Sequence, residues 1–243
     1  PFAPGGSSEI VARAVAAEMA KTLENAYRDV QIAFANEVAL ACEELGADAF
    51  EVRKLVNTCP FRDMHIPGAG VGGHCLPKDS WLFASSLKTT KPRIMTTARE
   101  VNEYMPVRMV ELVKKGLEEA GVELASAKVA IMGLAFLRDS DDTRNSPSLT
   151  IIDRLIGQVK ELIVHDPMVQ KAYKAPMVRD IEEALANADS MVIVTDHSSY
   201  LDMDLESIKE MMRTPLIVDG RNVLNADAVR SKGFRYLGIG KGK

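Results

Sequence analysis

The amino-acid sequence predicts an α/β protein, in which an all-helical first half, residues 1–125, precedes a second half with a parallel sheet, residues 126–243. Two patterns carry this prediction. Up to Gly121, apolar residues recur at spacings of three and four, which is the period of an amphipathic helix. After Ser126, short apolar runs alternate with helical segments, and this alternation is typical of βαβ units.

The first half is predicted to contain four helical segments. A helical pattern begins at about Glu9, and its strongest part, residues 21–45, ends before Gly46. Its apolar stripe is Leu23, Tyr27, Val30, Phe34, Val38, Ala41 and Leu45. The other segments are residues 49–57 with Asp48 as cap, a short helix from about Asp79, and residues 96–120 with a bend at Pro106. Residues 58–77, rich in proline and glycine, are predicted to be a loop.

The second half is predicted to contain five buried strands and three helices. Buried strands of a parallel sheet read as short continuous apolar runs rather than as alternating ones. The runs are residues 128–134, 161–164, 190–195, 216–218 and, more weakly, 235–239. The helical patterns between them are residues 148–158, 180–187 and 205–212.

Composition narrows the classes of partner. The net charge of −4, without a basic run, argues against nucleic acid as the main partner. No apolar run is long enough to span a bilayer and no signal peptide opens the chain, so no membrane association is expected. Three irregularly spaced cysteines indicate reduced thiols and a cytoplasmic protein. The chain starts at Pro1 in a loop-like stretch, which suggests a fragment, a processed product or a trimmed polypeptide.

The most informative motif is the glycine-rich loop that begins at Pro67. Its pattern Gly68-x-Gly70-x-x-Gly73 matches a dinucleotide-binding fingerprint, but that fingerprint needs a strand before it and a helix directly after it. Neither context is predicted here, so we reject that interpretation. The loop is instead predicted to lie close to a ligand and to present Cys75 to it, because glycines carry no Cβ. A tight or flexible surface loop is the simpler alternative.

The three cysteines differ in their surroundings. Cys42 lies in an apolar helix and is predicted to be a small buried side chain, and Cys59, before Pro60, is predicted to be structural. Cys75 has Lys78 and a helix start close by, and both features favour a nucleophilic thiolate. His74 raises the possibility of a metal site, but no second pair of residues at ligand spacing exists, so no metal is predicted.

Further polar residues follow predicted helices and strands. Lys21 and Asn25 share one helix face, which spacing alone would assign to an ordinary solvated surface. Residues 133–147 and 219–222 follow predicted strands, where ligands of parallel sheets gather. Their arginines Arg144 and Arg221 suit phosphates, although plain loops with a helix cap remain the alternative. The first strand lacks the G-x-G-x-x-G turn, so this half is not an ordinary NAD domain.

Taken together and in order, these segments resemble the UDP-glucose/GDP-mannose dehydrogenase family, the UDP-sugar 6-dehydrogenases. KTLENAYRDV at residues 21–30 is similar to the start of the family's central helix, and GGHCLPKD at 72–79 resembles its nucleophile loop. GLAF at 133–136, DDTR at 141–144 and DGRN at 219–222 resemble its C-terminal nucleotide-sugar domain. The loop sequence PGAGVGGHC is most similar to that of family members that oxidise UDP-N-acetylhexosamines, UDP-N-acetylmannosamine in particular. The resemblance covers nearly everything from about Ala17 onward.

The resemblance implies a helical dimerisation domain, a Rossmann-like UDP-sugar-binding domain, a homodimer and NAD as cofactor. The implied reaction oxidises the primary alcohol of the sugar twice, through a thiohemiacetal and a thioester on Cys75. The implied catalytic residues are Cys75, Lys21 and Asn25 for the developing oxyanion, and Asp79 as a base for water. The implied substrate-binding residues are Gly72, Gly73, Phe136, Arg138, Arg221 and, toward the neighbouring subunit, Arg62. The implied cofactor-binding residues are Lys78 and Arg144.

Two departures from the family pattern bear on these expectations. The family usually has lysine after Gly-Leu-Ala-Phe, where this chain has Leu137, so Arg138 is expected to take over its phosphate contact. The family's N-terminal dinucleotide-binding domain is absent from the sequence, so the chain alone is expected to bind UDP-sugar weakly or not at all and to be inactive. A non-catalytic dimerisation or nucleotide-sugar-binding module is the alternative function.

Overall fold

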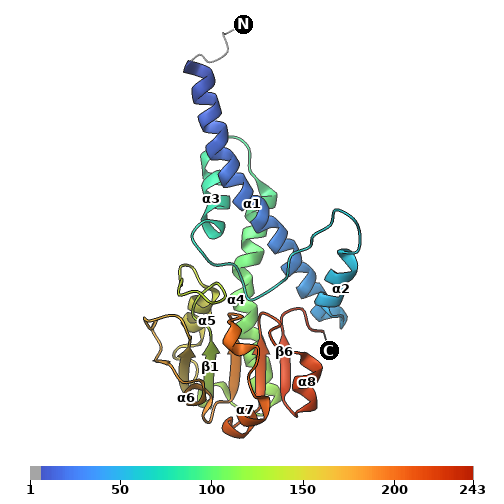
Figure 1. Cartoon of the computed structure of the whole chain (residues 1–243), viewed down its shortest axis with the longest axis vertical. Helices are drawn as coiled ribbons and strands as arrows, with labels where there is room; N and C mark the ends of the chain where they lie inside the picture. The colour runs from blue at the N-terminus through green and yellow to red at the C-terminus, as the bar shows by residue number, and fades with distance from the viewer. Residues whose placement is uncertain (1–6, 243) are drawn as a thin grey trace.

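The computed structural model describes residues 7–242, which form an elongated helical part standing on an α/β part (Figure 1). The expected fold class is confirmed. The loop expected for residues 1–6 lies outside the described residues. The helices are α1 (Ser7–Leu45), α2 (Ala49–Val56), α3 (Leu76–Ser86), α4 (Arg93–Glu119), α5 (Pro147–Leu155), α6 (Ile181–Leu185), α7 (Leu205–Met211) and α8 (Ala226–Ser231). The strands are β1 (Lys128–Met132), β2 (Glu161–His165), β3 (Met177–Val178), β4 (Ser190–Ile193), β5 (Leu216–Asp219) and β6 (Arg235–Gly238).

The face of α1 that packs against α4 differs from the apolar stripe read from the sequence. The buried face consists of small and polar residues, among them Ala26, Ala33 and Asn36. Alanine lets two helices approach closely, because interaxial distance depends on the side chains at the contact. Two aromatic side chains of the stripe, Tyr27 and Phe34, are 65% and 59% exposed. No helix among residues 7–242 is long and apolar enough to cross a membrane.

Helix α3 begins earlier than predicted, and this places Cys75 at its N-cap position. The sequence suggested a start near Asp79, but the first helical residue is Leu76. Pro77 lies in the first turn, where its fixed φ and missing N–H are compatible with a helix. The prediction for α2 was closer, since Asp48 caps it by accepting a hydrogen bond of 2.8 Å from the backbone N–H of Phe50.

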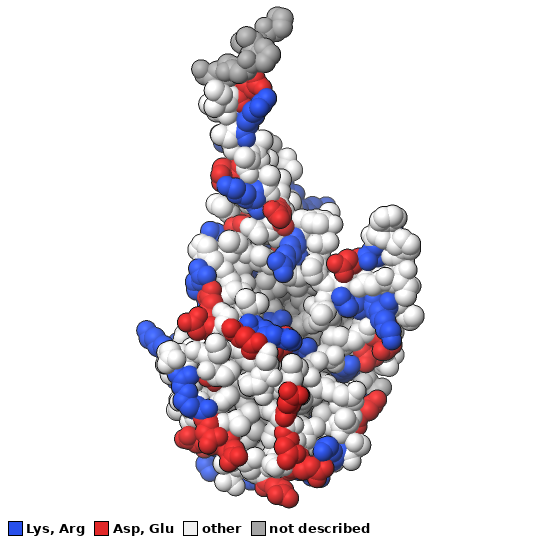
Figure 2. Space-filling model, in the orientation of Figure 1, with Lys and Arg blue, Asp and Glu red and all other residues white. Residues whose placement is uncertain are grey.

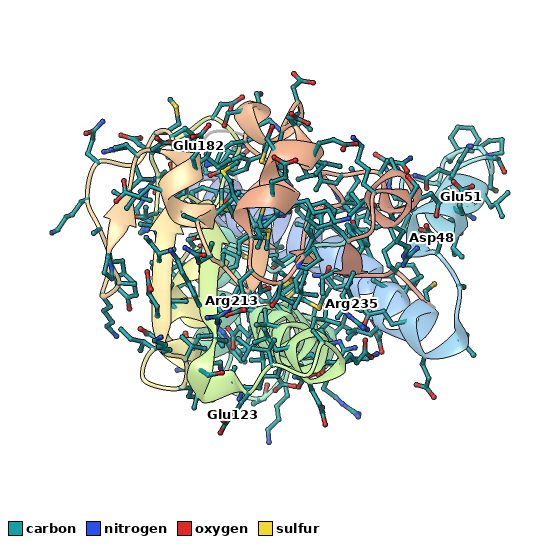
Figure 3. The ribbon with its side chains drawn as sticks, turned by 90° about the horizontal axis from the view of Figure 1, so that it is seen from below. Asp48, Glu51, Glu123, Glu182, Arg213 and Arg235 are labelled. Atoms are coloured by element: carbon teal, nitrogen blue, oxygen red, sulfur yellow. The ribbon has the colours of Figure 1, made fainter. Side chains whose placement is uncertain are left out.

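The sheet is entirely parallel, with the strand order β3-β2-β1-β4-β5-β6. Seen from below in Figure 3, α4 lies on one side of the sheet and α6 and α7 on the other. Side chains alternate accordingly: Val129 and Ile131 of β1 join the core with α4 and α5, whereas Ala130 and Met132 join the core with α6, α7 and α8. Both faces are buried, which explains the continuous apolar runs.

Two elements escaped prediction, and one boundary is not sharp. Strand β3 and helix α8 have two and six residues, too few for a periodic signal.

Helix α4 continues through Pro106 and packs on the sheet. Gly116 leaves room there for Leu216, because a Cβ on Gly116 would lie 2.7 Å from Leu216 Cδ1. One apolar core therefore joins the helical and α/β parts, and the domain boundary near residue 125 stays a prediction.

Candidate active site

The glycine-rich loop lies against the carboxyl ends of the strands, where the helical part meets the sheet. A Cβ added to Gly68 would lie 3.0 Å from Nη1 of Arg221, the arginine after β5. A Cβ added to Gly72 would lie 2.3 Å from Cβ of Phe136, which follows β1, and one on Gly73 would lie 3.1 Å from that ring. Gly72 requires glycine, and the other two positions leave little room for a larger residue, because the loop backbone itself touches the side chains of the α/β part.

Two hydrogen bonds hold the loop directly before the cysteine. The backbone N–H of Gly73 donates to the carbonyl oxygen of Arg144 at 2.7 Å, and Nδ2 of Asn145 donates to the carbonyl oxygen of Gly73 at 2.9 Å. Gly73 has φ +93°, a left-handed conformation that glycine adopts without strain. The segment at residues 140–147 therefore positions the loop that carries Cys75.

The Cys75 thiol is exposed at the N-cap of α3. The backbone carbonyl oxygen of Cys75 accepts a hydrogen bond from the backbone N–H of Asp79 at 2.8 Å, and this bond closes the first turn of the helix. Cys42 is buried, as predicted. Cys59 is also exposed, and its thiol donates to the carbonyl oxygen of Pro60 at 3.8 Å, so the structural role predicted for it stays a prediction.

Asn25 and Asp79 come together from helices α1 and α3. Nδ2 of Asn25 donates to Oδ2 of Asp79 at 2.8 Å, and Asp79 is buried, with 7% of its surface exposed. Lys21, one helical turn before Asn25, is bonded instead to Glu18 at 2.9 Å, and 71% of its side chain is exposed. The described residues show no bond from Lys21 to Cys75 or Asp79. Of the predicted oxyanion pair, Asn25 is therefore held in place beside the thiol loop, whereas Lys21 faces solvent.

Two exposed cations, Lys78 and Arg144, lie on the segments that flank the thiol loop. Nζ of Lys78 lies 3.3 Å from Nε2 of His74, and because an ammonium only donates, this histidine nitrogen must accept. Arg144 binds both carboxylate oxygens of Asp142, and these bonds hold the pKa of Asp142 below its ordinary value. On the face shown in Figure 2, basic and acidic side chains are interspersed in the same way, and the acidic ones gather at the lower end.

Arg221 carries a charge that no described carboxylate neutralises directly. Its Nε donates to the carbonyl oxygen of Val194 at 3.0 Å, and Nη2 lies 3.5 Å from the carbonyl oxygen of Phe136. Burial lowers the pKa of Arg221, although Asp196 and Asp219 act in the opposite direction. Arg138, in contrast, is bonded to Asp196 at 2.6 Å and is half exposed. A partly buried guanidinium bonded only to carbonyls suits an anionic ligand at the ends of the strands.

Asp166 follows β2, and its carboxylate reaches the turn after β1. In ordinary dinucleotide-binding domains this turn binds a phosphate. The Asp166 carboxylate accepts hydrogen bonds from the backbone N–H groups of Leu134 and Ala135 at 2.6 and 2.9 Å, and from Nε2 of His197 at 3.2 Å. Burial alone would raise the pKa of Asp166, but these bonds outweigh burial and hold it far below its ordinary value. The N–H groups after β1 thus face an internal anion, which explains why this turn lacks the glycine fingerprint.

One predicted residue lies apart from this group. Arg62 is exposed on the loop after α2. In Figure 1, α2 and α3 lie on opposite sides of α1. Some functional candidates were also missed, namely Asp166, Asn145 and the buried polar residues under the glycine loop. Asp29 and Asn36 share a helix face with Asn25 and with the small apolar residues Ala26 and Ala33, and polar residues at helical spacing among alanines were a signal in the sequence.

Cavity size alone does not locate the site. A hollow of about 390 Å³ borders the thiol loop at Val71 and Pro77, between Asn102 of α4 and Ser146 before α5. A larger hollow of about 1090 Å³ lies between α1, α4 and β6, and none of the predicted site residues lines it. The contacts of the glycine loop are the better guide.

Comparisons with known proteins relate both halves of the chain to one family. Residues 15–104 match the central domain of the UDP-glucose/GDP-mannose dehydrogenase family, and residues 130–226 match its UDP binding domain. The UDP-N-acetyl-D-mannosamine dehydrogenase of Pyrococcus horikoshii is 41% identical over 94% of this chain and 53% of its own length. The solved UDP-D-ManNAc dehydrogenase of that organism superposes with a TM-score of 0.86, at 40% identity, over 93% of this chain and 52% of its own.

A second solved structure shows the same relation. The NDP-N-acetyl-D-galactosaminuronic acid dehydrogenase of Methanosarcina mazei superposes with a TM-score of 0.86, at 37% identity, over 93% of this chain and 51% of its own. The chain thus spans about half the length of these relatives.

Proposed function

Because this chain belongs to the UDP-glucose/GDP-mannose dehydrogenase family, of which it contains the central and UDP binding domains, we propose that it forms part of an NAD-dependent UDP-sugar 6-dehydrogenase. The enzyme would oxidise the C6 hydroxyl of a UDP-N-acetylhexosamine to the carboxylate. The observation that supports this most is the docking of the Cys75 loop, through Gly68 and Gly72, on Arg221 and Phe136. Through this contact, the loop that carries Cys75 touches an arginine that none of the described carboxylates binds directly.

The favoured substrate is UDP-N-acetylmannosamine. It is the substrate in the name of the 41% identical relative, and the spelling of the thiol loop suggests the same class of sugar. The name of the 37% identical relative from Methanosarcina mazei supports an N-acetylgalactosamine-derived substrate as the second candidate. Both sugars carry an N-acetyl group, so the proposed class is UDP-N-acetylhexosamine.

In the proposed mechanism, Arg221 binds the diphosphate and Phe136 packs against the nucleotide-sugar, which places C6 of the sugar near Cys75. After the first oxidation, the Cys75 thiolate adds to the aldehyde and forms a thiohemiacetal, whose oxygen Asn25 stabilises. Lys21 would have to leave Glu18 and turn toward the thiol before it could share this role. The second oxidation gives a thioester. Asp79, held by Asn25, then takes a proton from the water that attacks the thioester, and the thiolate leaves. Arg138 would have to leave Asp196 before it could bind a phosphate.

NAD would accept both hydrides, and the residues near the thiol fit it only in part. Lys78 and Arg144 are exposed cations on the rim beside Cys75, where they would contact the pyrophosphate. The turn after β1 offers the cofactor no free backbone N–H at Leu134 or Ala135, because Asp166 accepts both. We therefore infer that most of the NAD site lies outside this chain, and that residues 126–243 serve the UDP-sugar.

The function is tested with the full-length enzyme that contains this chain. With NAD⁺ and UDP-N-acetylmannosamine, we expect two NADH for each uronate formed, because the alcohol is oxidised twice. Turnover should be slower with UDP-glucose. Faster oxidation of UDP-glucose would contradict the substrate, and uronate formation by the isolated chain would contradict the incomplete NAD site. UDP-sugar binding without oxidation by the full-length protein would favour a non-catalytic module.

We also propose a homodimer through α1. The exposed stripe that includes Phe34 borders a hollow of about 720 Å³, which Val30 lines together with Ile94 and Val101 of α4. A second copy would cover this apolar surface symmetrically, and Arg62 would reach the partner's substrate.

If α1 forms the dimer interface, a charged residue at its centre should convert the dimer into a monomer. Sedimentation should show the chain at twice its own mass, and Phe34→Glu should shift it to monomer, because each interface would bury two unpaired carboxylates. Leu201→Glu, at an exposed apolar position in the α/β part, is the matched control and should remain dimeric. A Phe34→Glu variant that stays dimeric would place the interface elsewhere.

A further inference from the structure

A buried chain of polar side chains connects the helical part to the glycine loop. Oδ1 of Asn36 on α1 accepts a hydrogen bond from the backbone N–H of Gly68 at 2.9 Å, and its Nδ2 donates to Oδ1 of Asn102 on α4 at 2.8 Å. Nδ2 of Asn102 donates to Oδ1 of Asp29 at 2.8 Å, and Arg99 donates to the same oxygen at 2.6 Å. All four side chains are at most 1% exposed.

The direction of every bond in this chain is determined. Gly68 can only donate, so Asn36 must turn its oxygen toward the loop and its amide nitrogen toward Asn102. Asn102 must then accept from Asn36 and donate to Asp29, whose carboxylate can only accept when ionised. Since both amides have one satisfied orientation, the chain holds Gly68 at one place relative to α1 and α4.

Gly68 is also the point at which the thiol loop touches Arg221. The space beside its Cα is filled by Nη1 of Arg221 and by the carbonyl oxygen of Gly220, each about 3 Å from the position of a Cβ. The other end of the loop, at Gly73, is held by Arg144 and Asn145 of the α/β part. The helical part thus holds the loop at its start and the α/β part holds it next to the thiol.

We propose that Asn36 and Asn102 are positioning residues that set the separation between the Cys75 thiol and the Arg221 guanidinium. This inference rests on the proposed function. A sugar bound by its diphosphate at Arg221 presents C6 at a fixed distance, so the thiol must be held at the matching distance. Both asparagines are only 1% exposed, so a direct contact with the substrate is not part of the proposal. They act through the backbone of residues 68–75.

The test uses Asn36→Ala in the full-length enzyme, with Asn36→Ser as a second variant in case alanine prevents folding. The serine hydroxyl is too short to span Gly68 and Asn102 together. For either variant, kcat for the UDP-sugar should fall about tenfold, because an unpaired buried donor displaces the loop and a small misplacement of reacting groups is costly. KM should change less than about twofold, because Arg221 and Phe136 remain in place.

Val113→Ala is the matched control, because Val113 is a fully buried residue of α4 outside the polar chain. It should lower the thermal stability by a similar amount and leave kcat unchanged. An Asn36 variant whose kcat equals that of Val113→Ala would overturn the positioning role, as would a loss confined to KM. If the wild-type enzyme oxidises no UDP-sugar at all, the proposed function fails rather than this inference.

Discussion

Replacing Cys75 by alanine is expected to abolish uronate formation by the full-length enzyme. The proposed second oxidation needs a covalent thiol adduct, and no other described thiol replaces Cys75, because Cys42 is buried and Cys59 lies on the loop after α2. Loss of a covalent nucleophile typically lowers kcat by roughly 10⁴-fold or more. The measurement is uronate formed from UDP-N-acetylmannosamine and NAD⁺, detected by mass spectrometry.

Cys59→Ala is the control for this experiment, since Cys59 is the other exposed thiol. It should leave the rate of uronate formation unchanged. Iodoacetamide labelling with peptide mapping gives an independent readout: Cys75 should react before Cys59 and Cys42, and UDP-sugar should protect it. Full activity of Cys75→Ala, or faster labelling of Cys59, would refute the assignment of the nucleophile.

Replacing Gly72 by alanine is expected to have the second largest effect. The added methyl group would lie 2.3 Å from Cβ of Phe136, an atom that every residue except glycine possesses, so no side-chain rotation relieves the clash. The loop or the residues after β1 must therefore move, and both carry proposed substrate contacts. We expect kcat/KM for the UDP-sugar to fall roughly 100-fold, the scale of a 1 Å misplacement.

Gly121→Ala separates this clash from the general cost of losing glycine. Gly121 has φ +72°, and no other atom lies within 4 Å of the position that a Cβ would take, so alanine there adds backbone strain of about 1 kcal/mol without a clash. It should lower the denaturation midpoint slightly and leave kcat/KM unchanged. If Gly72→Ala binds and oxidises the substrate like the wild type, the docking of the thiol loop on Phe136 is wrong.

The candidate site could be predicted in part because some of its signals are local. Cys75, Asp79 and the glycines lie within one short stretch of sequence. Because glycine has no Cβ, the glycines themselves indicate that other atoms approach the loop backbone closely. The hydrogen bond between Asn25 and Asp79 was not predicted, since 54 positions separate them in the chain, and only the resemblance assigned both residues to the site. For Arg138 and Lys21, the motifs gave no indication that Asp196 and Glu18 would bind these side chains.

The sequence by itself determined the fold class, the parallel sheet and the order of its longer elements, but not the short β3 and α8. The predicted features follow from hydrophobic periods and helix-ending residues, which act over a few positions, and the five longer strands were all recognisable from their apolar runs. The sequence also identified the thiol loop, because the glycines, Cys75 and Asp79 that define it are close neighbours in the chain.

Only the tertiary structure decided which face of α1 is buried and which charges are neutralised. The alanine face packs on α4 while Phe34 faces outward, because close helix packing favours small residues and leaves the larger ones for another surface. Asp166 takes the N–H groups after β1, and Asn36 holds Gly68, through bonds between residues that lie about 30 positions apart. Such contacts depend on how whole elements pack, and no local pattern of residues specifies them.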